Sequence, residues 1–285
     1  MSARYWQTSR FKIDLSRPRV MGIVNLTPDS FSDGGLDAHV QDSVRRCERM
    51  IAEGADILDL GAESTRPGAT PLAAKQEQAR LLPVLREVLR WGVPVSVDTY
   101  KPEVMQVALD LGADIINDIW ALRWSAASGP SATEVVAAHP ACGVCLMHMH
   151  LEPTTMQVAP MQGSVASPVL DFLQQRLVQA QAAGLAFERL AIDPGIGFGK
   201  TVEQNFELLR EQVSLKAPGS PLVIGWSRKS SLAHVGHKEE KLAVGDRLVP
   251  SVAAAVLAAE RGADVLRVHD VRETVQALKL LSRIR

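Results

Sequence analysis

The chain has 285 residues, 46% of them hydrophobic, which is enough for one large domain with a substantial core, although two small domains would also fit this length. Its 31 basic and 32 acidic side chains give a formal net charge of −1, which excludes the broad basic field that holds a nucleic-acid backbone or an anionic membrane. No apolar run approaches the roughly 20 residues that span a bilayer, and residues 1–10 lack the apolar stretch of a secretory signal. We therefore expect a cytoplasmic protein whose partners are small molecules, with neither nucleic acid nor membrane among them.

Short apolar, β-branched segments alternate along the chain with segments of helical periodicity. The short segments predict eight strands, at residues 20–24, 57–60, 93–97, 115–117, 143–147, 190–192, 222–224 and 265–268. Apolar residues at i, i+3, i+4 spacing predict helices over residues 43–52, 75–90, 104–111, 169–183, 203–212, 251–261 and 271–282. Gly-Ala pairs at 54–55, 112–113 and 262–263 indicate helix ends just before a strand. Residues 123–130 and 152–167 are rich in Ser, Gly and Pro and are predicted to be loops.

Eight strand–helix units predict the α/β fold class and, within it, a single-domain (β/α)8 TIM barrel that spans residues 1–285. A doubly wound open sheet is the alternative, but it usually has fewer strands. The barrel also explains why polar residues lie at or just past the carboxyl end of each strand, because barrel active sites form there. The residues in these places are Asn25, Asp59, Asp98, Asn117, His148, Asp193, Ser227 with Arg228 and Lys229, and Arg267 with His269.

Two carboxylates and an amide at three of these strand ends suggest a flat, nitrogen-rich ligand. Asp98, Asn117 and Asp193 lie at the carboxyl ends of the third, fourth and sixth predicted strands. A carboxylate accepts two parallel N–H bonds from a guanidine-like edge such as that of a pterin, and each charge-assisted bond contributes about 1.5–3 kcal/mol away from water. The alternative is that each residue only caps a helix or pairs with a basic neighbour.

A second group of strand ends is suited to an anion. Residues 227–230 (Ser-Arg-Lys-Ser) follow a predicted strand and open a predicted helix, where backbone N–H groups and the helix dipole attract a phosphate or carboxylate. Arg267 and His269 are two residues apart on the last strand, so both side chains point the same way. Together with Asn25 and Arg66 they would surround a diphosphate.

Two loop sequences have the composition of ligand-binding loops. Asp29 and Asp33 lie in a turn-rich segment and could hold Mg²⁺ through water, although a plain surface loop is an equal alternative. Residues 195–201 resemble a phosphate-binding P-loop, but Pro194 stands where that pattern requires its first glycine. No nucleotide site is therefore predicted.

Histidine and cysteine pairs occur near the fifth strand. His148 and His150 alternate as in barrel metallohydrolases, but no second cluster of ligands accompanies them, so zinc is not expected. Cys142 and Cys145 have the spacing of a redox pair or half of a zinc site. Because the intervening sequence is typical of strand rather than of a helix start, we interpret this pair as structural.

Considered together, these motifs resemble the dihydropteroate synthases along nearly the whole chain. The matching segments, in order and spacing, are residues 21–35, 61–68, 96–99, 117–118, 193–200, 225–230 and 267–270. The resemblance implies a barrel enzyme that condenses 6-hydroxymethyl-7,8-dihydropterin diphosphate with p-aminobenzoate, giving 7,8-dihydropteroate and diphosphate in folate biosynthesis. It also implies a homodimer.

The resemblance further implies a set of site residues. The pterin pocket would use Asp98, Asn117, Asp193 and Lys229 at the polar edge and Met147 on a face. The diphosphate would lie near Asn25, Arg267 and His269, with Mg²⁺ held near Asn25 and Asp33. The p-aminobenzoate site would contain Phe31, Arg66, Pro67, Phe198, Lys229 and Ser230, and Thr65 and Gly225 are also expected to contact substrate. The expected catalytic residues are Asn25, Arg66, Asp98, Asp193, Lys229, Arg267 and His269.

The expected reaction is SN1-like, because an electron-rich dihydropterin stabilises a cation at its exocyclic CH2 group, so diphosphate departs before the neutral amine attacks. Two features differ from the family pattern. His150 and Leu151 stand where Gln and Gly are expected, and residues 119–130 are less typical. Both features bear on substrate fit rather than on activity.

Three alternatives share some of these residues. A pterin-binding methyltransferase domain would share the barrel but should lack the 65–67 loop and the 227–230 segment. A catalytically silent paralogue would bind pterin or stabilise a partner without catalysis. In a Schiff-base aldolase, Lys229 would be the nucleophile.

Overall fold

The structure, a computed structural model, describes residues 4–27, 35–65, 68–126, 128–216, 219–236 and 240–284, with the backbone alone at residues 35–38. An eight-stranded parallel sheet has the order β8-β7-β6-β5-β4-β3-β10-β9. A parallel bridge between Ile192 and Leu222 joins its two edges, and Ile192 N donates to Pro221 O at 2.9 Å. The strands are β3 (Arg19–Asn25), β4 (Ile57–Gly61), β5 (Val95–Asp98), β6 (Ile115–Asp118), β7 (Gly143–Met147), β8 (Leu190–Asp193), β9 (Val223–Ile224) and β10 (Val265–Val268).

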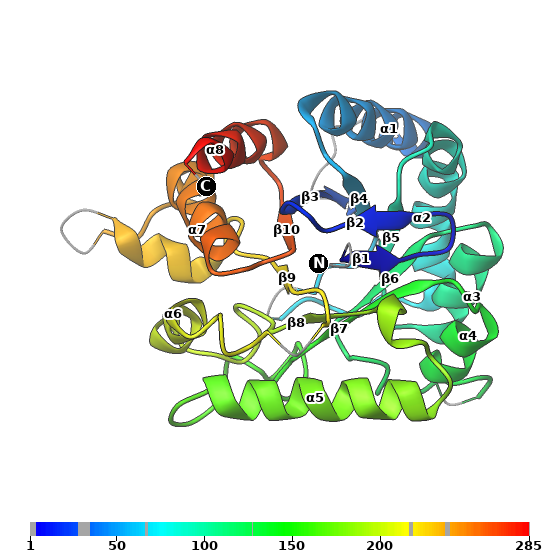
Figure 1. Cartoon of the computed structure of the whole chain (residues 1–285). Helices are drawn as coiled ribbons and strands as arrows, with labels where there is room; N and C mark the ends of the chain where they lie inside the picture. Colours follow the sequence, from blue (N-terminus) through cyan, green and yellow to red (C-terminus); the bar gives the residue numbers. More distant parts are fainter. Residues whose placement is uncertain are drawn as a thin grey trace.

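Helices alternate with these strands and surround the sheet (Figure 1). They are α1 (Gly35–Glu53), α2 (Ala74–Val88), α3 (Pro102–Asp110), α4 (Ala132–Ala138), α5 (Ala166–Ala182), α6 (Val202–Arg210), α7 (Leu248–Glu260) and α8 (Val271–Arg283). The predicted single-domain (β/α)8 barrel is confirmed, and the predicted strands agree with the observed ones within two residues at either end. No helix in the described part of the chain is long and apolar enough to cross a membrane.

Helix α4 was not predicted, although its start carries a recognisable signal. Ser131 accepts a hydrogen bond from Glu134 N at 3.2 Å, and the Glu134 carboxylate accepts from Ser131 N at 2.8 Å, which is a capping box. The S-x-x-E pattern at 131–134 could have revealed this helix. By contrast, the predicted helix ends at Gly54, Gly112 and Gly262 are confirmed, because each glycine has a positive φ that ends a helix readily.

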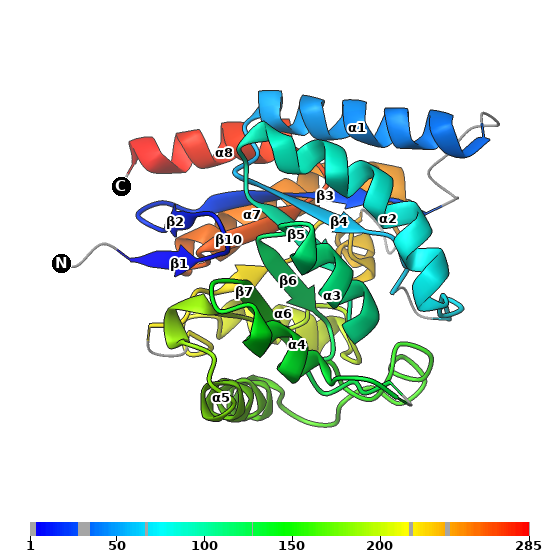
Figure 2. The same ribbon diagram turned by 90° about the vertical axis from the view of Figure 1, so that its right-hand side faces the viewer.

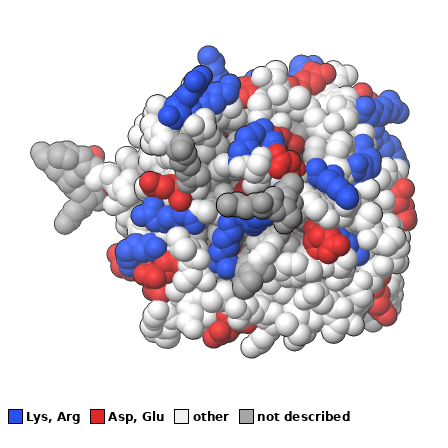
Figure 3. All heavy atoms as spheres, in the orientation of Figure 1, with Lys and Arg blue, Asp and Glu red and all other residues white. Residues whose placement is uncertain are grey.

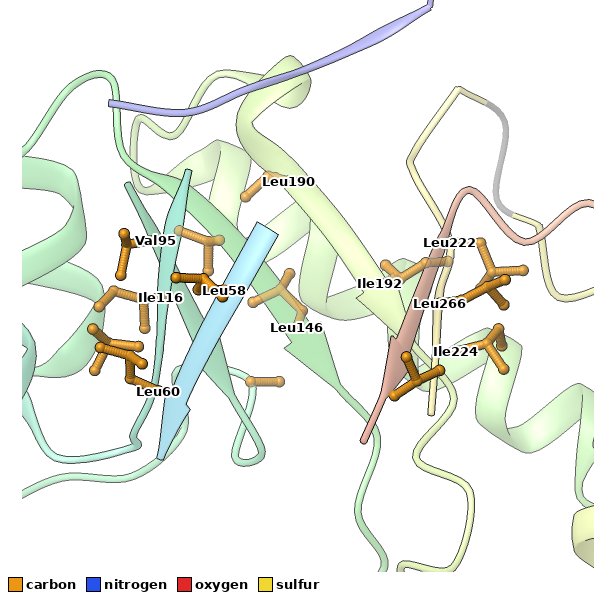
Figure 4. Packing of buried hydrophobic residues seen from close by; sticks show 14 of the residues in the cluster. Leu58, Leu60, Val95, Ile116, Leu146, Leu190, Ile192, Leu222, Ile224 and Leu266 are labelled. Carbon is orange, nitrogen blue, oxygen red and sulfur yellow. The ribbon is translucent and has the colours of Figure 1, made fainter. Parts of the chain in front are cut away.

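Alternation along the strands divides the core into two parts. Outward-facing residues pack between the strands and the helices, as Leu58, Leu60, Ile116, Leu146 and Leu266 do in Figure 4. Inward-facing residues at the amino ends of the strands form a second, separate apolar cluster; these include Met21, Ile57, Ile115, Cys145, Ala191, Val223 and Val265. The interior of the barrel is therefore filled with apolar side chains at the amino ends of the strands. The interior at the carboxyl ends (the polar half) is left for polar side chains.

A hairpin of β1 (Tyr5–Gln7) and β2 (Lys12–Asp14) closes the amino end of the barrel, opposite the carboxyl ends of the strands (Figure 2). Trp6, Ile13 and Leu15 join the inward-facing apolar cluster. Trp6 is fully buried, and its Nε1 donates to Arg189 O at 2.8 Å. The hairpin was not predicted, because its two strands have only three residues each.

Acidic and basic side chains are mixed on the face drawn in Figure 3, with no area of a single sign.

Candidate functional site

A cavity opens among the carboxyl ends of the strands, and most of the predicted site residues line it. Among the described residues its lining includes nine predicted ones: Thr65, Asp98, Asn117, Met147, Asp193, Phe198, Gly225, Lys229 and Arg267. Ile119, Gly195 and Ile196 also line it and were not predicted. Neighbouring strands place the polar residues side by side, since Asp98 is paired with Asn117 and Met147 with Asp193 in the register of the sheet.

Arg267 lies between two carboxylates at the bottom of the polar half. Its Nε donates to Asp59 Oδ2 at 2.6 Å, and its Nη2 donates to Asp98 Oδ2 at 2.5 Å. Burial opposes the charge on Arg267, but the two carboxylates together raise its pKa. Asp59 is fully buried, and its Oδ1 has no hydrogen-bond partner among the described residues. The sequence placed Asp59 at a strand end, whereas it lies in the middle of β4, and its pairing with Arg267 was not predicted.

The two cavity carboxylates are poorly hydrated. Burial raises the pKa of Asp98 to about 7, although the Arg267 charge acts in the opposite direction. Burial also raises the pKa of Asp193, against a hydrogen bond that its Oδ1 accepts from Gly195 N at 2.7 Å and against the charge of Lys229. Carboxylates held away from water form stronger hydrogen bonds to a ligand that presents N–H groups.

Lys229 and Phe198 both line the cavity and contact each other. The Lys229 ammonium lies 4.3 Å from the centroid of the Phe198 ring, within the range of a cation–π contact. Lys229 precedes a short 3-10 segment, η4 (Ser230–Val235), so the helix predicted after residue 230 is wrong in type. The anion site expected at residues 227–230 is therefore left with their side chains and backbone N–H groups, without the dipole of an α-helix.

His269 has a defined ring orientation beside the cavity. Its backbone N donates to Ser227 Oγ at 3.1 Å, and the same hydroxyl lies 3.0 Å from His269 Nδ1. Burial and the nearby Arg267 charge lower the pKa of His269 to about 3, so the ring is neutral at pH 7. When the hydroxyl donates to Nδ1, the ring proton is on Nε2, where it can be donated to an anion.

Other predicted site residues are not part of the cavity lining or cannot be placed. Asn25 ends β3 with its side chain half-buried, and Ser230 is exposed; neither lines the cavity, nor does His269. Phe31, Asp33, Arg66 and Pro67 lie outside the described residues.

Cys142, Cys145 and His148, which belong to the sequence patterns set aside earlier, are buried. Cys142 and Cys145 are buried free thiols, and burial raises the pKa of both, which agrees with a structural interpretation. His148 Nδ1 is 3.0 Å from Lys200 Nζ. Within the described ranges, no three His, Cys, Asp or Glu side chains are grouped as metal ligands.

Comparisons with known proteins agree with this geometry. Residues 21–269 match the family model described as "Pterin binding enzyme". The chain is 46% identical over 282 residues to the dihydropteroate synthase of Neisseria meningitidis serogroup C, covering 98% of this chain and 97% of the relative. It is 44% identical over 273 residues to that of Escherichia coli K12, covering 94% and 92%.

Two solved structures have nearly the same fold. Xanthomonas albilineans dihydropteroate synthase with 4-aminobenzoic acid superimposes with a TM-score of 0.90 at 43% identity, covering 99% of this chain and 98% of the other. Burkholderia cenocepacia dihydropteroate synthase complexed with 7,8-dihydropteroate superimposes with a TM-score of 0.88 at 44% identity, covering 99% and 97%.

Proposed function

We propose how this chain, which belongs to the dihydropteroate synthases of the pterin-binding enzyme family, carries out its reaction. The chain is a transferase of folate biosynthesis. Its proposed substrates are 6-hydroxymethyl-7,8-dihydropterin diphosphate and p-aminobenzoate, bound by one catalytic domain of residues 1–285 that acts in the cytoplasm. The observation that carries this proposal is the cavity itself, where two desolvated carboxylates, an amide and two cations meet.

The pterin ring is proposed to enter the cavity with its nitrogen-rich edge first. Asp98, Asn117 and Asp193 offer carboxylate and amide groups to the N–H groups of that edge. Met147 and Ile119 belong to an apolar cluster that also lines the cavity, and they cover the ring faces. Polar groups at the bottom and apolar groups on the walls suit a flat ligand that is polar on one edge.

The diphosphate is then proposed to lie near Asn25, His269 and Arg267. A neutral His269 with its proton on Nε2 donates one hydrogen bond, and Arg267 adds positive charge. The amide oxygen of Asn25 is a hard ligand of the kind Mg²⁺ accepts, and Asn25 with Asp33 would hold that ion. Bound Mg²⁺ supplies positive charge that compensates the charge of the diphosphate.

The reaction is proposed to be SN1-like. The C–O bond between the exocyclic CH2 and the diphosphate breaks first, and the bonding pair leaves with the diphosphate. Asp98 and Asp193 lie in a water-poor cavity, where their negative charge stabilises the pterin cation. The amine of p-aminobenzoate, held near Phe198, Lys229, Ser230 and the 65–67 loop, then forms the C–N bond and loses a proton.

A direct assay tests the function. The purified chain is incubated with dihydropterin diphosphate, p-aminobenzoate and Mg²⁺, and dihydropteroate and released diphosphate are measured. Both products are expected in equal amounts. Pterin binding without product would instead indicate the silent paralogue. Borohydride trapping of a carbonyl substrate on Lys229 would indicate the aldolase.

A homodimer is proposed as the state in solution. Helices α7 and α8 carry exposed apolar side chains, including Val249, Leu257 and Leu280. Burying this surface between two copies would remove it from water. Light scattering coupled to size exclusion should give twice the mass of the 30.9 kDa chain, and a monomer at all concentrations would contradict the proposal.

A further inference from the structure

Lys200 is a buried lysine that the proposed reaction does not use. It lies in the loop between β8 and α6 (residues 194–201, the β8–α6 loop), and only 2% of its surface is exposed. This loop supplies Gly195, Ile196 and Phe198 to the cavity lining. A lysine this deeply buried must have partners for its ammonium group, because desolvation of an unpaired charge is costly.

Three acceptors surround the Lys200 ammonium. Nζ is 2.9 Å from Gly195 O, 3.1 Å from Phe198 O and 3.0 Å from His148 Nδ1. An ammonium has three N–H donors, so all of them are used. Burial lowers the pKa of Lys200 to about 7, with Asp193 acting in the opposite direction. A neutral amine would keep the same contacts by donating to both carbonyls and accepting from Nδ1–H.

Two glycines allow the loop to lie directly against the segment that follows β7. Gly195 has φ of +68°, and a Cβ there would be 1.9 Å from His148 O. Gly199 has φ of +69°, and a Cβ there would be 2.6 Å from His150 Cβ. Larger residues would push the two segments apart. Lys200 therefore bridges two segments whose backbones are already in contact.

The same loop positions groups that face the ligand. Lys200 Nζ binds the carbonyl of Phe198, whose ring contacts the Lys229 ammonium. It also binds the carbonyl of Gly195, whose N–H donates to Asp193. By contrast, Asp98 and Asn117 lie on strands β5 and β6 and do not depend on this loop.

From these contacts we propose that Lys200 and His148 form a positioning pair that fixes the β8–α6 loop and so holds Phe198 and Lys229 in place for p-aminobenzoate. This inference rests on the proposed function, because it assigns the second substrate to that side of the cavity. Lys200 acts through the loop and does not itself touch substrate. Its loss should impair p-aminobenzoate use more than pterin binding.

The kinetic test uses Lys200→Met, which keeps the length of the side chain and removes its donors, and His148→Leu, which removes one acceptor. In Lys200→Met the KM for p-aminobenzoate should rise about 10- to 100-fold, the range expected for a misplaced binding group. The Kd of dihydropterin diphosphate should change by less than about threefold, because Asp98 and Asn117 lie on strands and the loop reaches the pterin pocket through one hydrogen bond, from Gly195 N to Asp193. His148→Asn, which places an acceptor near the position of Nδ1, should restore the KM that His148→Leu raises.

Gln157→Ala is the matched control. Gln157 is exposed, and its Nε2 donates to Gly197 O of the same loop at 2.7 Å. Loss of this exposed hydrogen bond should leave the KM for p-aminobenzoate and the Kd of dihydropterin diphosphate unchanged. Wild-type KM values in Lys200→Met and His148→Leu would overturn the proposal. Equal losses of affinity for p-aminobenzoate and for dihydropterin diphosphate would also overturn it, since these would indicate a merely structural role.

A measurement without substrate separates this proposal from the proposed function. The ¹⁵N resonance of His148 Nδ1 in the free protein should shift in Lys200→Met and stay in place in Gln157→Ala. An unchanged resonance in Lys200→Met would overturn the positioning pair, whatever the kinetic constants show. A shifted resonance in a chain that makes no dihydropteroate would leave the pair standing and reject the proposed function.

Discussion

Arg267 joins Asp98 to Asp59 through one guanidinium group, with contacts of 2.5 Å to Asp98 Oδ2 and 2.6 Å to Asp59 Oδ2. Asp98 faces the cavity and is held by Arg267. Arg267 is held in turn by Asp59, which is fully buried. The orientation of Asp98 is therefore set before any ligand arrives, and the ligand does not have to order it.

Asp98→Asn should weaken binding of dihydropterin diphosphate about 10- to 100-fold, because it replaces charge-assisted hydrogen bonds with weaker neutral ones. Fluorescence titration of the pterin measures the change. Asp110→Asn, at an exposed carboxylate in the last turn of α3, is the control and should bind normally. Normal binding by Asp98→Asn would remove this residue from the pterin pocket.

Binding of the pterin is expected to depend on pH through the protonation of Asp98. Burial raises the pKa of Asp98 to about 7, so lowering the pH through this value protonates the group and removes the charge that the pterin edge needs. Pterin affinity should therefore be highest above about pH 8 and fall by up to tenfold per pH unit below about pH 7. Binding isotherms across this range measure it, and the dependence should be weaker in Asp98→Asn. A flat profile for the wild type would contradict the prediction.

Lys101 is predicted to stabilise the start of the loop that follows β4. Its ammonium binds the carboxylates of Glu63 and Glu77, at 2.6 Å from Glu77 Oε2, and all three side chains are almost fully buried. Glu63 is two residues from Thr65, which lines the cavity. Lys101→Met leaves two buried carboxylates without their cation and should lower the free energy of unfolding by about 3–5 kcal/mol. Urea denaturation measures this change.

Glu77→Gln provides the matched variant for this cluster. Burial raises the pKa of Glu77, so adding Glu77→Gln to Lys101→Met removes one uncompensated charge and should regain part of the lost stability. For the same reason, the defect of Lys101→Met should become smaller at low pH, where Glu77 is protonated. Equal stability of Lys101→Met and the wild type would show that the cluster contributes nothing.

Trp6→Ala should separate stability from catalysis. Trp6 fills the amino end of the barrel and donates to Arg189 O. Its truncation should lower the free energy of unfolding by about 3–5 kcal/mol. The KM of both substrates should stay unchanged, because the cavity is at the other end of the strands. Tyr5→Ala, at a neighbouring residue that is 38% exposed, is the control and should have little effect. Altered substrate constants in Trp6→Ala would show that the two ends are coupled.

Local sequence patterns were enough to predict the barrel fold and the position of most site residues in it. Strand period, helix period and glycine at helix ends act over a few residues, so eight units could be counted, and a parallel barrel then requires that their carboxyl ends meet. Asp98, Asn117, Asp193, Lys229 and Arg267 were predicted for this reason, and all five line the cavity.

Only the tertiary structure decided which groups are partners. The pairing of Arg267 with Asp59 joins residues 208 positions apart, and that of Lys200 with His148 joins residues 52 positions apart. The hairpin that closes the barrel also takes its stability from distant contacts, since its two strands are too short to persist alone. Periodicity reports which side of an element is buried, but a hydrogen bond depends on the relative placement of two elements, and that placement exists only once the whole barrel has closed.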